Sequence, residues 1–108
     1  MSSKFGNLLS PTIVGNLKVR NRVVLLPHLT FYASEDFRPT ERHKLYYAER
    51  AKGGVGLIVT ECLPIHPNGG CGNSVDASDR RKMLLWRDTI DACHDHGAKI
   101  VAQLTHYG

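Results

Sequence analysis

The sequence predicts an α/β protein with about three parallel strands and two helices, preceded by a short β-hairpin. Apolar runs alternate with helix-type segments in the order strand, helix, strand, helix, strand. Both helix-type segments lead into the next strand through short glycine-containing turns, at Gly53-Gly54 and Gly97-Ala98. A crossover helix between consecutive strands returns the chain to the same end of the sheet, so the strands should be parallel. With 108 residues, of which 42% are hydrophobic, the chain is long enough for one core.

The first part of the chain predicts a hairpin and then a buried strand. In residues 12–21, two β-type stretches flank Gly15-Asn16, and these two residue types tolerate the positive φ of a tight turn. The apolar run Val23–Leu26 follows, as expected for a strand covered on both faces. Pro27 should end this strand because proline has no N–H to donate. Residues 28–39 then predict a loop.

A first helix is predicted from Glu41 to about Lys52, with Thr40 as its N-cap. Gly53 is expected to supply the left-handed residue that closes it. His43 is expected to be exposed. The side chains expected to form the buried stripe, by their spacing of three and four, are Leu45, Ala48, Tyr47 and Ala51.

The remaining chain predicts a second strand, a long loop, a second helix and a third strand. The second strand is 55–62, and the loop is 63–80, which is longer than most connections and is therefore expected to be functional or partly disordered. The second helix is expected at about 83–96 and the third strand at 99–108. The side chains on the apolar face of that helix are Trp86, Ile90 and Cys93.

Parallel β/α units place the carboxyl ends of all their strands at one edge of the sheet. That edge is where such folds place binding and catalysis. The residues expected there are Pro27–Phe31, Glu61–Pro67 and Gln103–Tyr107. These three segments are the candidate site.

Charge and hydropathy exclude several classes of partner. The formal net charge is +4, but the basic residues are scattered, and the run Arg80–Lys82 has Asp76 and Asp79 beside it. A nucleic-acid surface would be denser and interleaved with aromatic residues, so no nucleic-acid partner is predicted. No apolar run approaches the ~18 residues that cross a bilayer, and no secretory signal is expected from the first residues. The prediction is a cytoplasmic protein without a membrane partner.

The three cysteines, Cys62, Cys71 and Cys93, do not form a disulfide pattern. Reduced thiols in a cytoplasm are the expectation. Cys62, His66 and Cys71 lack the spacing of a zinc site and a fourth ligand, so no metal site is predicted.

Three segments together resemble the N-terminal segment of the old yellow enzyme family. They read LLSPTIVGNLKVRNRVVLLPH, YYAERAKGGVGLIVTE and HGAKIVAQLTHYG. Members are flavin mononucleotide (FMN) oxidoreductases on a (β/α)₈ TIM barrel, and the resemblance runs from about Leu8 to Gly108, weakening in the 63–80 loop. Pro27-His28, in place of the commoner Pro-Met, resembles the branch with 2,4-dienoyl-CoA reductase and trimethylamine dehydrogenase. A complete barrel needs ~250 residues, so residues 1–108 are expected to be the incomplete N-terminal portion of an FMN-binding TIM-barrel domain.

The resemblance implies cofactor-binding roles for five residues. Pro27, His28 and Leu29 match a strand end that lies along the flavin ring, partly through backbone groups. Cys62 matches a small residue that packs near the flavin. Gln103 matches the glutamine that binds the pyrimidine edge of the ring, for which an amide offers both a donor and an acceptor.

Other residues near these positions are given different roles. Leu29 cannot donate a side-chain hydrogen bond to the flavin as relatives do, and Thr30 is the residue expected to substitute. His106 is expected to have a structural role. Glu61 is expected to be an acceptor between strand and helix rather than a catalytic acid. The catalytic residues are unknown, because the positions that carry them in the family lie beyond Gly108.

The implied reaction is reduction of FMN by NAD(P)H, followed by hydride transfer to an activated alkene such as an enone or an enoyl thioester. One alternative is an amine dehydrogenase of the same family, with an iron–sulfur cluster downstream, since no C-x-x-C motif is present here. The other is a truncated, non-catalytic fragment, and the 108-residue piece alone is expected to be inactive. The small-molecule substrate and the choice of NADH or NADPH stay open, as does the oligomeric state, including a homo-oligomer.

Overall fold

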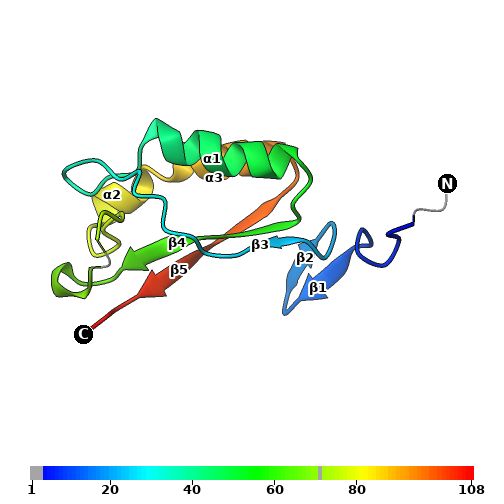
Figure 1. The fold of residues 1–108 in the computed structure, drawn as a ribbon, viewed down its shortest axis with the longest axis horizontal. Helices are drawn as coiled ribbons and strands as arrows, with labels where there is room; N and C mark the ends of the chain where they lie inside the picture. The colour runs from blue at the N-terminus through cyan, green and yellow to red at the C-terminus, as the bar shows by residue number, and fades with distance from the viewer. Residues whose placement is uncertain (1–3, 71) are drawn as a thin grey trace.

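The computed structural model describes residues 4–70 and 72–108 (Figure 1). Within these residues the chain forms five strands, three α-helices and one short 3₁₀ helix. In chain order the elements are β1 (Thr12–Val14), β2 (Leu17–Val19), β3 (Val24–Leu25), α1 (Glu41–Lys52), β4 (Leu57–Pro64), η1 (Pro67–Gly69), α2 (Arg80–Leu84), α3 (Arg87–Asp95) and β5 (Lys99–Thr105).

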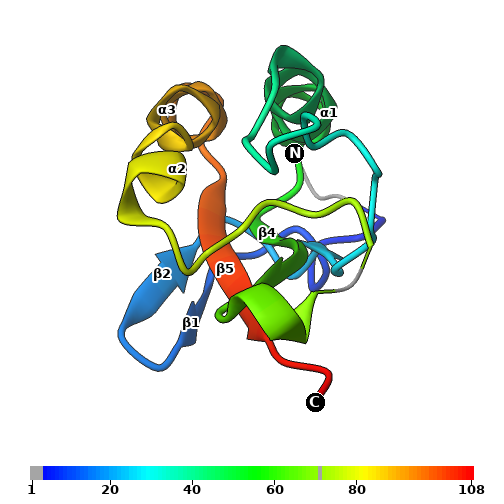
Figure 2. The same cartoon turned by 90° about the vertical axis from the view of Figure 1, so that its left-hand side faces the viewer.

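The main sheet is parallel, with strand order β3-β4-β5. A separate antiparallel pair is formed by β1 and β2. Figure 2 shows the three α-helices gathered on one side of the main sheet, and Figure 1 shows the same arrangement from a second direction. The predicted hairpin and the predicted order of parallel strands are therefore confirmed.

Arg20, directly after the hairpin, joins it to the helix C-termini. Its guanidinium donates to the carbonyl oxygens of Ala51 at 2.7 Å, Val55 at 3.0 Å and His96 at 2.5 Å. The Ala51 and His96 carbonyls lie at the ends of α1 and α3, and that of Val55 lies in the turn after α1. A cation is favourable at a helix C-terminus because the last carbonyls of a helix lack partners. The hairpin is thus fastened to the end of the sheet opposite the candidate site.

Helix α1 has the predicted bounds, and of the predicted buried stripe Tyr47 and Ala51 are buried while Ala48 is half-buried. The buried residues are His43, Tyr47 and Ala51, spaced by four, whereas Leu45 is 62% exposed. The expectations that Leu45 is buried and His43 exposed are both wrong. The reason is tertiary: β4 presents a buried Glu61 to this helix, and a histidine and a tyrosine can hydrogen-bond in that environment while a leucine cannot.

The turn from α1 to β4 depends on three glycines. Gly53 is right-handed, with φ −71°, and Gly54 takes the positive φ of +112°, so the left-handed residue lies one position later than predicted. Gly56 makes room for Asn21: a Cβ on Gly56 would lie 2.5 Å from Asn21 Oδ1. Asn21 Nδ2 donates to the Gly54 carbonyl at 2.7 Å. Asn21 thereby supplies a partner for one carbonyl of the turn, whose N–H groups donate to backbone carbonyls.

The second predicted helix is observed as two. The Asp79 carboxylate caps α2 by accepting the Arg81 N–H at 2.9 Å, so the helical region begins before 83. Between α2 and α3, Leu85 and Trp86 donate to carbonyls three residues back, both at 3.1 Å. This tighter, 3₁₀-like turn interrupts the helix.

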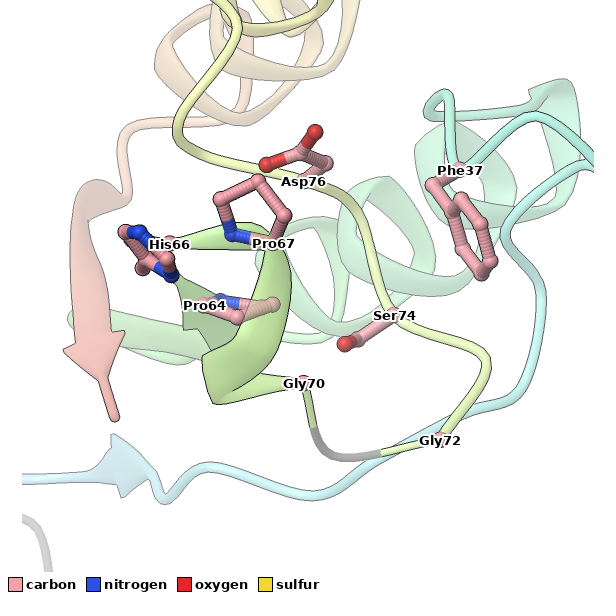
Figure 3. Close-up of a pocket in the computed structure, with 8 residues that line it drawn as sticks. All are labelled: Phe37, Pro64, His66, Pro67, Gly70, Gly72, Ser74 and Asp76. Carbon is pink, nitrogen blue, oxygen red and sulfur yellow. The ribbon is translucent and has the colours of Figure 1, made fainter. Parts of the chain in front are cut away.

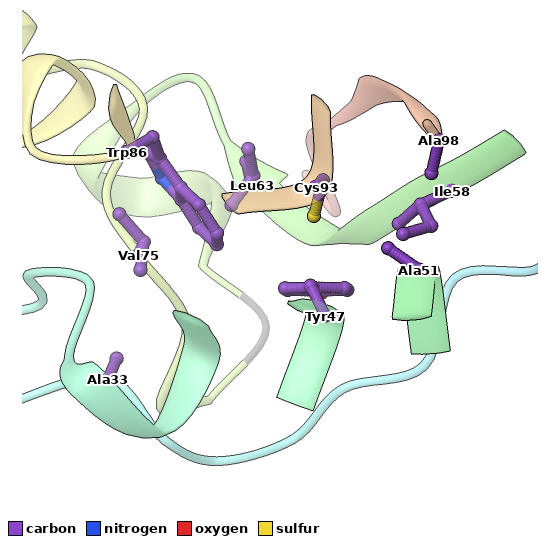
Figure 4. Close-up of a cluster of buried hydrophobic side chains, with 9 residues drawn as sticks. All are labelled: Ala33, Tyr47, Ala51, Ile58, Leu63, Val75, Trp86, Cys93 and Ala98. Atoms are coloured by element: carbon purple, nitrogen blue, oxygen red, sulfur yellow. The ribbon is translucent and has the colours of Figure 1, made fainter. Parts of the chain in front are cut away.

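The core lies between the helices and the main sheet (Figure 4). Trp86 and Cys93 come from the α2–α3 region, Tyr47 from α1, and Ile58 and Leu63 from β4. The predicted apolar face of 83–96 is confirmed, since Trp86 and Cys93 are buried and Ile90 packs against them. Within residues 4–70 and 72–108, no helix has the length and apolar character needed to cross a bilayer.

Candidate functional site

A β-bulge in β4 sets the geometry of the site. Val59 pairs with Val101, and the next pair is Cys62 with Gln103, so three steps along β4 match two along β5. The extra residue places Cys62 beside Gln103 and turns Glu61 toward the helices. The donors freed from the ladder have partners: Gln103 N–H donates to Thr60 Oγ1 at 3.1 Å, and Glu61 N–H donates to the Tyr47 hydroxyl at 2.8 Å.

A hollow of about 220 Å³ opens at the carboxyl ends of β3, β4 and β5. The structure brings together here all five residues that the sequence singled out, together with Tyr107. The lining residues are Pro27, His28, Leu29, Cys62, Gln103 and Tyr107. Tyr107 was not singled out, although it lies two residues beyond the end of β5, in the segment expected at this edge.

The hollow contains polar groups that are free to bind a ligand. Among the described residues, the Gln103 side-chain amide has no hydrogen-bond partner, and no hydrogen bond involves the main chain of His28 or Leu29. Such groups hold a planar ring with a polar edge, because an amide both donates and accepts and backbone groups have fixed directions. The donor set therefore fits the pyrimidine edge of a flavin.

Cys62 is 7% exposed and is bonded in a disulfide. The expectation of a reduced thiol is wrong for this residue in the structure. Cys93 is free and buried, and burial raises its pKa from 9.0 to about 11. Cys71 lies outside the described residues. The raised pKa makes Cys93 a poor nucleophile at neutral pH, consistent with a packing role.

Thr30 does not take the role predicted for it. Its hydroxyl donates to Glu61 Oε1 at 2.6 Å and also accepts the Tyr32 N–H at 3.2 Å. The hydroxyl hydrogen is therefore not available to a flavin in the hollow. Glu61 is fully buried, and its contact with Thr30 agrees with the expected role of a structural acceptor.

A second hollow, of about 170 Å³, lies beyond β4 in the predicted functional loop (Figure 3). Its polar side chains are already engaged: His66 Nδ1 accepts the Asn68 N–H at 3.1 Å. Asp76 accepts from the Ser78 hydroxyl and backbone. This hollow offers fewer free donors than the first, so the first is the stronger cofactor candidate.

The sequence model of the NADH:flavin oxidoreductase / NADH oxidase family matches residues 7–108. An NADH oxidase of Thermoanaerobacter brockii is 40% identical over 108 residues, which covers 96% of this chain and 16% of that protein. An N,N-dimethylglycine/sarcosine dehydrogenase of Chromohalobacter salexigens is 38% identical over 107 residues, covering 96% of this chain and 15% of that protein. The chain therefore spans less than a fifth of the length of these relatives.

The old yellow enzyme homologue of Zymomonas mobilis has a similar structure. It superposes with a TM-score of 0.87 at 33% sequence identity, covering 94% of this chain and 28% of that one. The three parallel strands with their helices match the N-terminal part of the TIM barrel, as the sequence predicted.

Proposed function

Because the chain belongs to the NADH:flavin oxidoreductase / NADH oxidase family, we propose that residues 7–108 form one wall of an FMN site in a longer oxidoreductase. The observation that carries this proposal is the hollow at the strand ends, where Gln103 and the His28–Leu29 backbone converge. The relatives are about six times longer than the segment they share with this chain. The activity is therefore assigned to the full-length polypeptide, meaning the one that carries these residues and completes the barrel.

Each proposed contact has a separate role. The Gln103 amide binds the pyrimidine edge, donating from its nitrogen and accepting at its oxygen. The backbone of His28 and Leu29 holds the adjoining polar edge of the ring. Cys62 and Pro27 lie against the ring and exclude water from it, which their position in the hollow supports.

FMN, when bound, supplies the redox chemistry: it takes up a hydride from NAD(P)H and gives it to an activated alkene such as an enone or enoyl thioester. The family's name contains NADH, which supports a reduced nicotinamide as the hydride donor. The residues of this segment bind and orient the ring, and the proton that completes alkene reduction comes from a group outside it. The substrate is a small molecule.

The test is to purify the full-length polypeptide and measure its visible absorbance and its NADH- and NADPH-dependent reduction of an enone. We expect a yellow protein that releases FMN on denaturation and oxidises a reduced nicotinamide when the enone is added. A protein that contains no flavin and takes up none when FMN is added would refute the proposal.

A second candidate, an amine dehydrogenase, is favoured by the similarity to the N,N-dimethylglycine/sarcosine dehydrogenase. In that reaction a secondary or tertiary amine reduces the flavin and NADH is not needed. Bleaching of the flavin absorbance by dimethylglycine or sarcosine under anaerobic conditions would select this reaction. Bleaching by NADH with reoxidation by an enone would select the first. Iron measurement on the same protein tests for the downstream cluster.

A further inference from the structure

A buried carboxylate lies directly behind the proposed FMN site and is not part of it. Glu61 precedes Cys62 on β4, but its side chain is on the helix side of the sheet and is fully buried. A buried carboxylate is unfavourable unless hydrogen bonds compensate it. The groups that contact the Glu61 carboxylate therefore indicate which part of the fold it holds in place.

Two groups converge on one oxygen of Glu61. The Thr30 hydroxyl donates to Oε1 at 2.6 Å, and His43 Nε2 lies 3.0 Å from the same atom, although its N–H does not point directly at it. His43 Nδ1 accepts the Thr40 N–H at 3.0 Å, so the ring N–H is at Nε2, the nitrogen nearer to the carboxylate. The loop after β3 therefore supplies the hydrogen bond to this oxygen, and α1 places the His43 ring beside it.

Thr30 links the Glu61 carboxylate to the loop after β3. Its hydroxyl also accepts the Tyr32 N–H at 3.2 Å, spanning Phe31, which has a φ of +59°. A left-handed phenylalanine is unfavourable without outside support. Additional support comes from Asn73 Nδ2, which donates to the Phe31 carbonyl at 3.1 Å. Side chains, rather than ladder hydrogen bonds, therefore fix this loop.

The constrained loop adjoins the backbone that lines the hollow. Thr30 is bonded directly to Leu29, and His28 and Leu29 have no main-chain hydrogen bonds among the described residues. Their orientation therefore depends on the residues on either side. On one side is Pro27 at the end of the strand, and on the other is Thr30, anchored to Glu61.

We propose that Glu61 is a positioning residue which, through Thr30, fixes the His28–Leu29 backbone against bound FMN. This inference rests on the proposed function. Glu61 touches neither flavin nor substrate; its hydrogen bond sets the direction of backbone groups that do. Loss of the bond lets Phe31 relax toward ordinary backbone angles and turns those groups away from the ring edge.

The test uses the full-length polypeptide, stripped of flavin and titrated with FMN, with dissociation constants taken from flavin fluorescence. Thr30→Val keeps the shape and removes the hydroxyl, and we expect about tenfold weaker binding, as for loss of one charge-assisted hydrogen bond. Thr30→Ser keeps the hydroxyl and should bind within about threefold of wild type. Glu61→Gln keeps an acceptor oxygen but loses the charge, and should weaken binding by about threefold to tenfold.

Ser34→Ala is the matched control. It removes a hydroxyl from the same loop, but that hydroxyl contacts Asp36 and the Arg38 N–H rather than Glu61. Its FMN affinity and absorption spectrum should equal those of wild type. In Thr30→Val, the absorption bands and the midpoint potential of the bound flavin should shift. In Thr30→Ser, both should have the wild-type values. A variant that is only less stable would leave both unchanged.

The outcomes separate this inference from the function beneath it. If wild type binds no FMN, the proposed function fails and the inference fails with it. If wild type binds FMN but Thr30→Val and Glu61→Gln bind it equally well with unaltered spectra, only the positioning role is overturned. If Thr30→Val does not fold, Glu61→Gln decides by the same criterion.

Discussion

Gln103 shows how one side chain can contribute to binding without contributing to stability. Its backbone N–H is held by Thr60, while its side-chain amide has no partner among the described residues. Gln103→Ala in the full-length polypeptide should therefore change the free energy of unfolding of the flavin-free protein by less than about 0.5 kcal/mol. Binding of FMN should weaken by about tenfold or more, because two hydrogen bonds to the ring are lost.

The measurement pairs denaturant unfolding of the flavin-free protein with a fluorescence titration of FMN. Lys99→Ala, at the opposite end of the same strand, is the control and should alter neither quantity. Unchanged affinity in Gln103→Ala would remove this residue from the site.

Cys93 gives a prediction for alkaline pH. Burial raises its pKa from 9.0 to about 11, so above pH 9 the unfolded chain loses this proton while the folded chain keeps it. The stabilising contribution is complete below about pH 9 and is lost as pH rises through about 11. Cys93→Ala should unfold with a shallower dependence of free energy on pH over that range.

The check is the free energy of unfolding from denaturant melts at several values between about pH 8 and pH 11. Burial also raises the pKa of Tyr47, so some alkaline dependence should remain in the Cys93→Ala variant. Identical slopes in wild type and Cys93→Ala would contradict the assignment.

At the scale of elements, Gly53 and Gly56 of the α1–β4 turn should respond differently to substitution by alanine. Gly56→Ala would place a Cβ 2.5 Å from Asn21 Oδ1 and 2.9 Å from the Asn21 carbonyl oxygen. Either Asn21 or the start of β4 must shift, which should cost about 1–3 kcal/mol of unfolding free energy. In Gly53→Ala, the new Cβ would lie 3.5 Å from its nearest atoms, and the residue already has a right-handed φ.

Gly53→Ala is therefore the matched control, and it should be neutral or stabilising by up to about 1 kcal/mol, because alanine restricts the unfolded chain. Chemical denaturation of the two variants beside wild type provides the comparison. Equal effects of the two substitutions would mean that Asn21 is not held against Gly56 as described.

At the scale of the whole molecule, the main sheet leaves apolar surface uncovered. Leu26 is 70% exposed, Leu104 62% and Val24 42%. The radius of gyration is 14.9 Å, against about 13 Å for a compact domain of this length. The hairpin lies beyond the helix-covered part (Figure 1), and β3 and β5 are the edge strands of the main sheet. In a closed barrel, further strands pair with both edges.

Residues 1–108 expressed alone should therefore associate and bind a hydrophobic dye, since unpaired strand edges and apolar patches attract other chains. The full-length polypeptide should show neither behaviour to the same degree. Light scattering and dye fluorescence at matched concentrations provide the measurement. A monodisperse, dye-free 108-residue monomer would show that these surfaces do not need the rest of a barrel.

The sequence determined the order of the strands and of α1, although it predicted one helix where α2 and α3 form. It could do so because periodicity, proline and glycine act locally: Pro27 follows β3, Thr40 precedes α1 and Gly97 follows α3. It also placed the five candidate site residues at one edge, since parallel strands must end together. The family resemblance assigned them to a flavin, and the comparisons support the family rather than each contact.

Only the tertiary structure decided which side chains of β4 and α1 face each other. The extra residue in β4 turns Glu61 toward α1, and that buried carboxylate is why His43 is enclosed while Leu45 is exposed. It also draws the Thr30 hydroxyl away from the hollow. The sequence did predict Glu61 as an acceptor between strand and helix, but the bulge and the partners of that acceptor depend on residues far apart in the chain, so local pattern and propensity contain no signal for them.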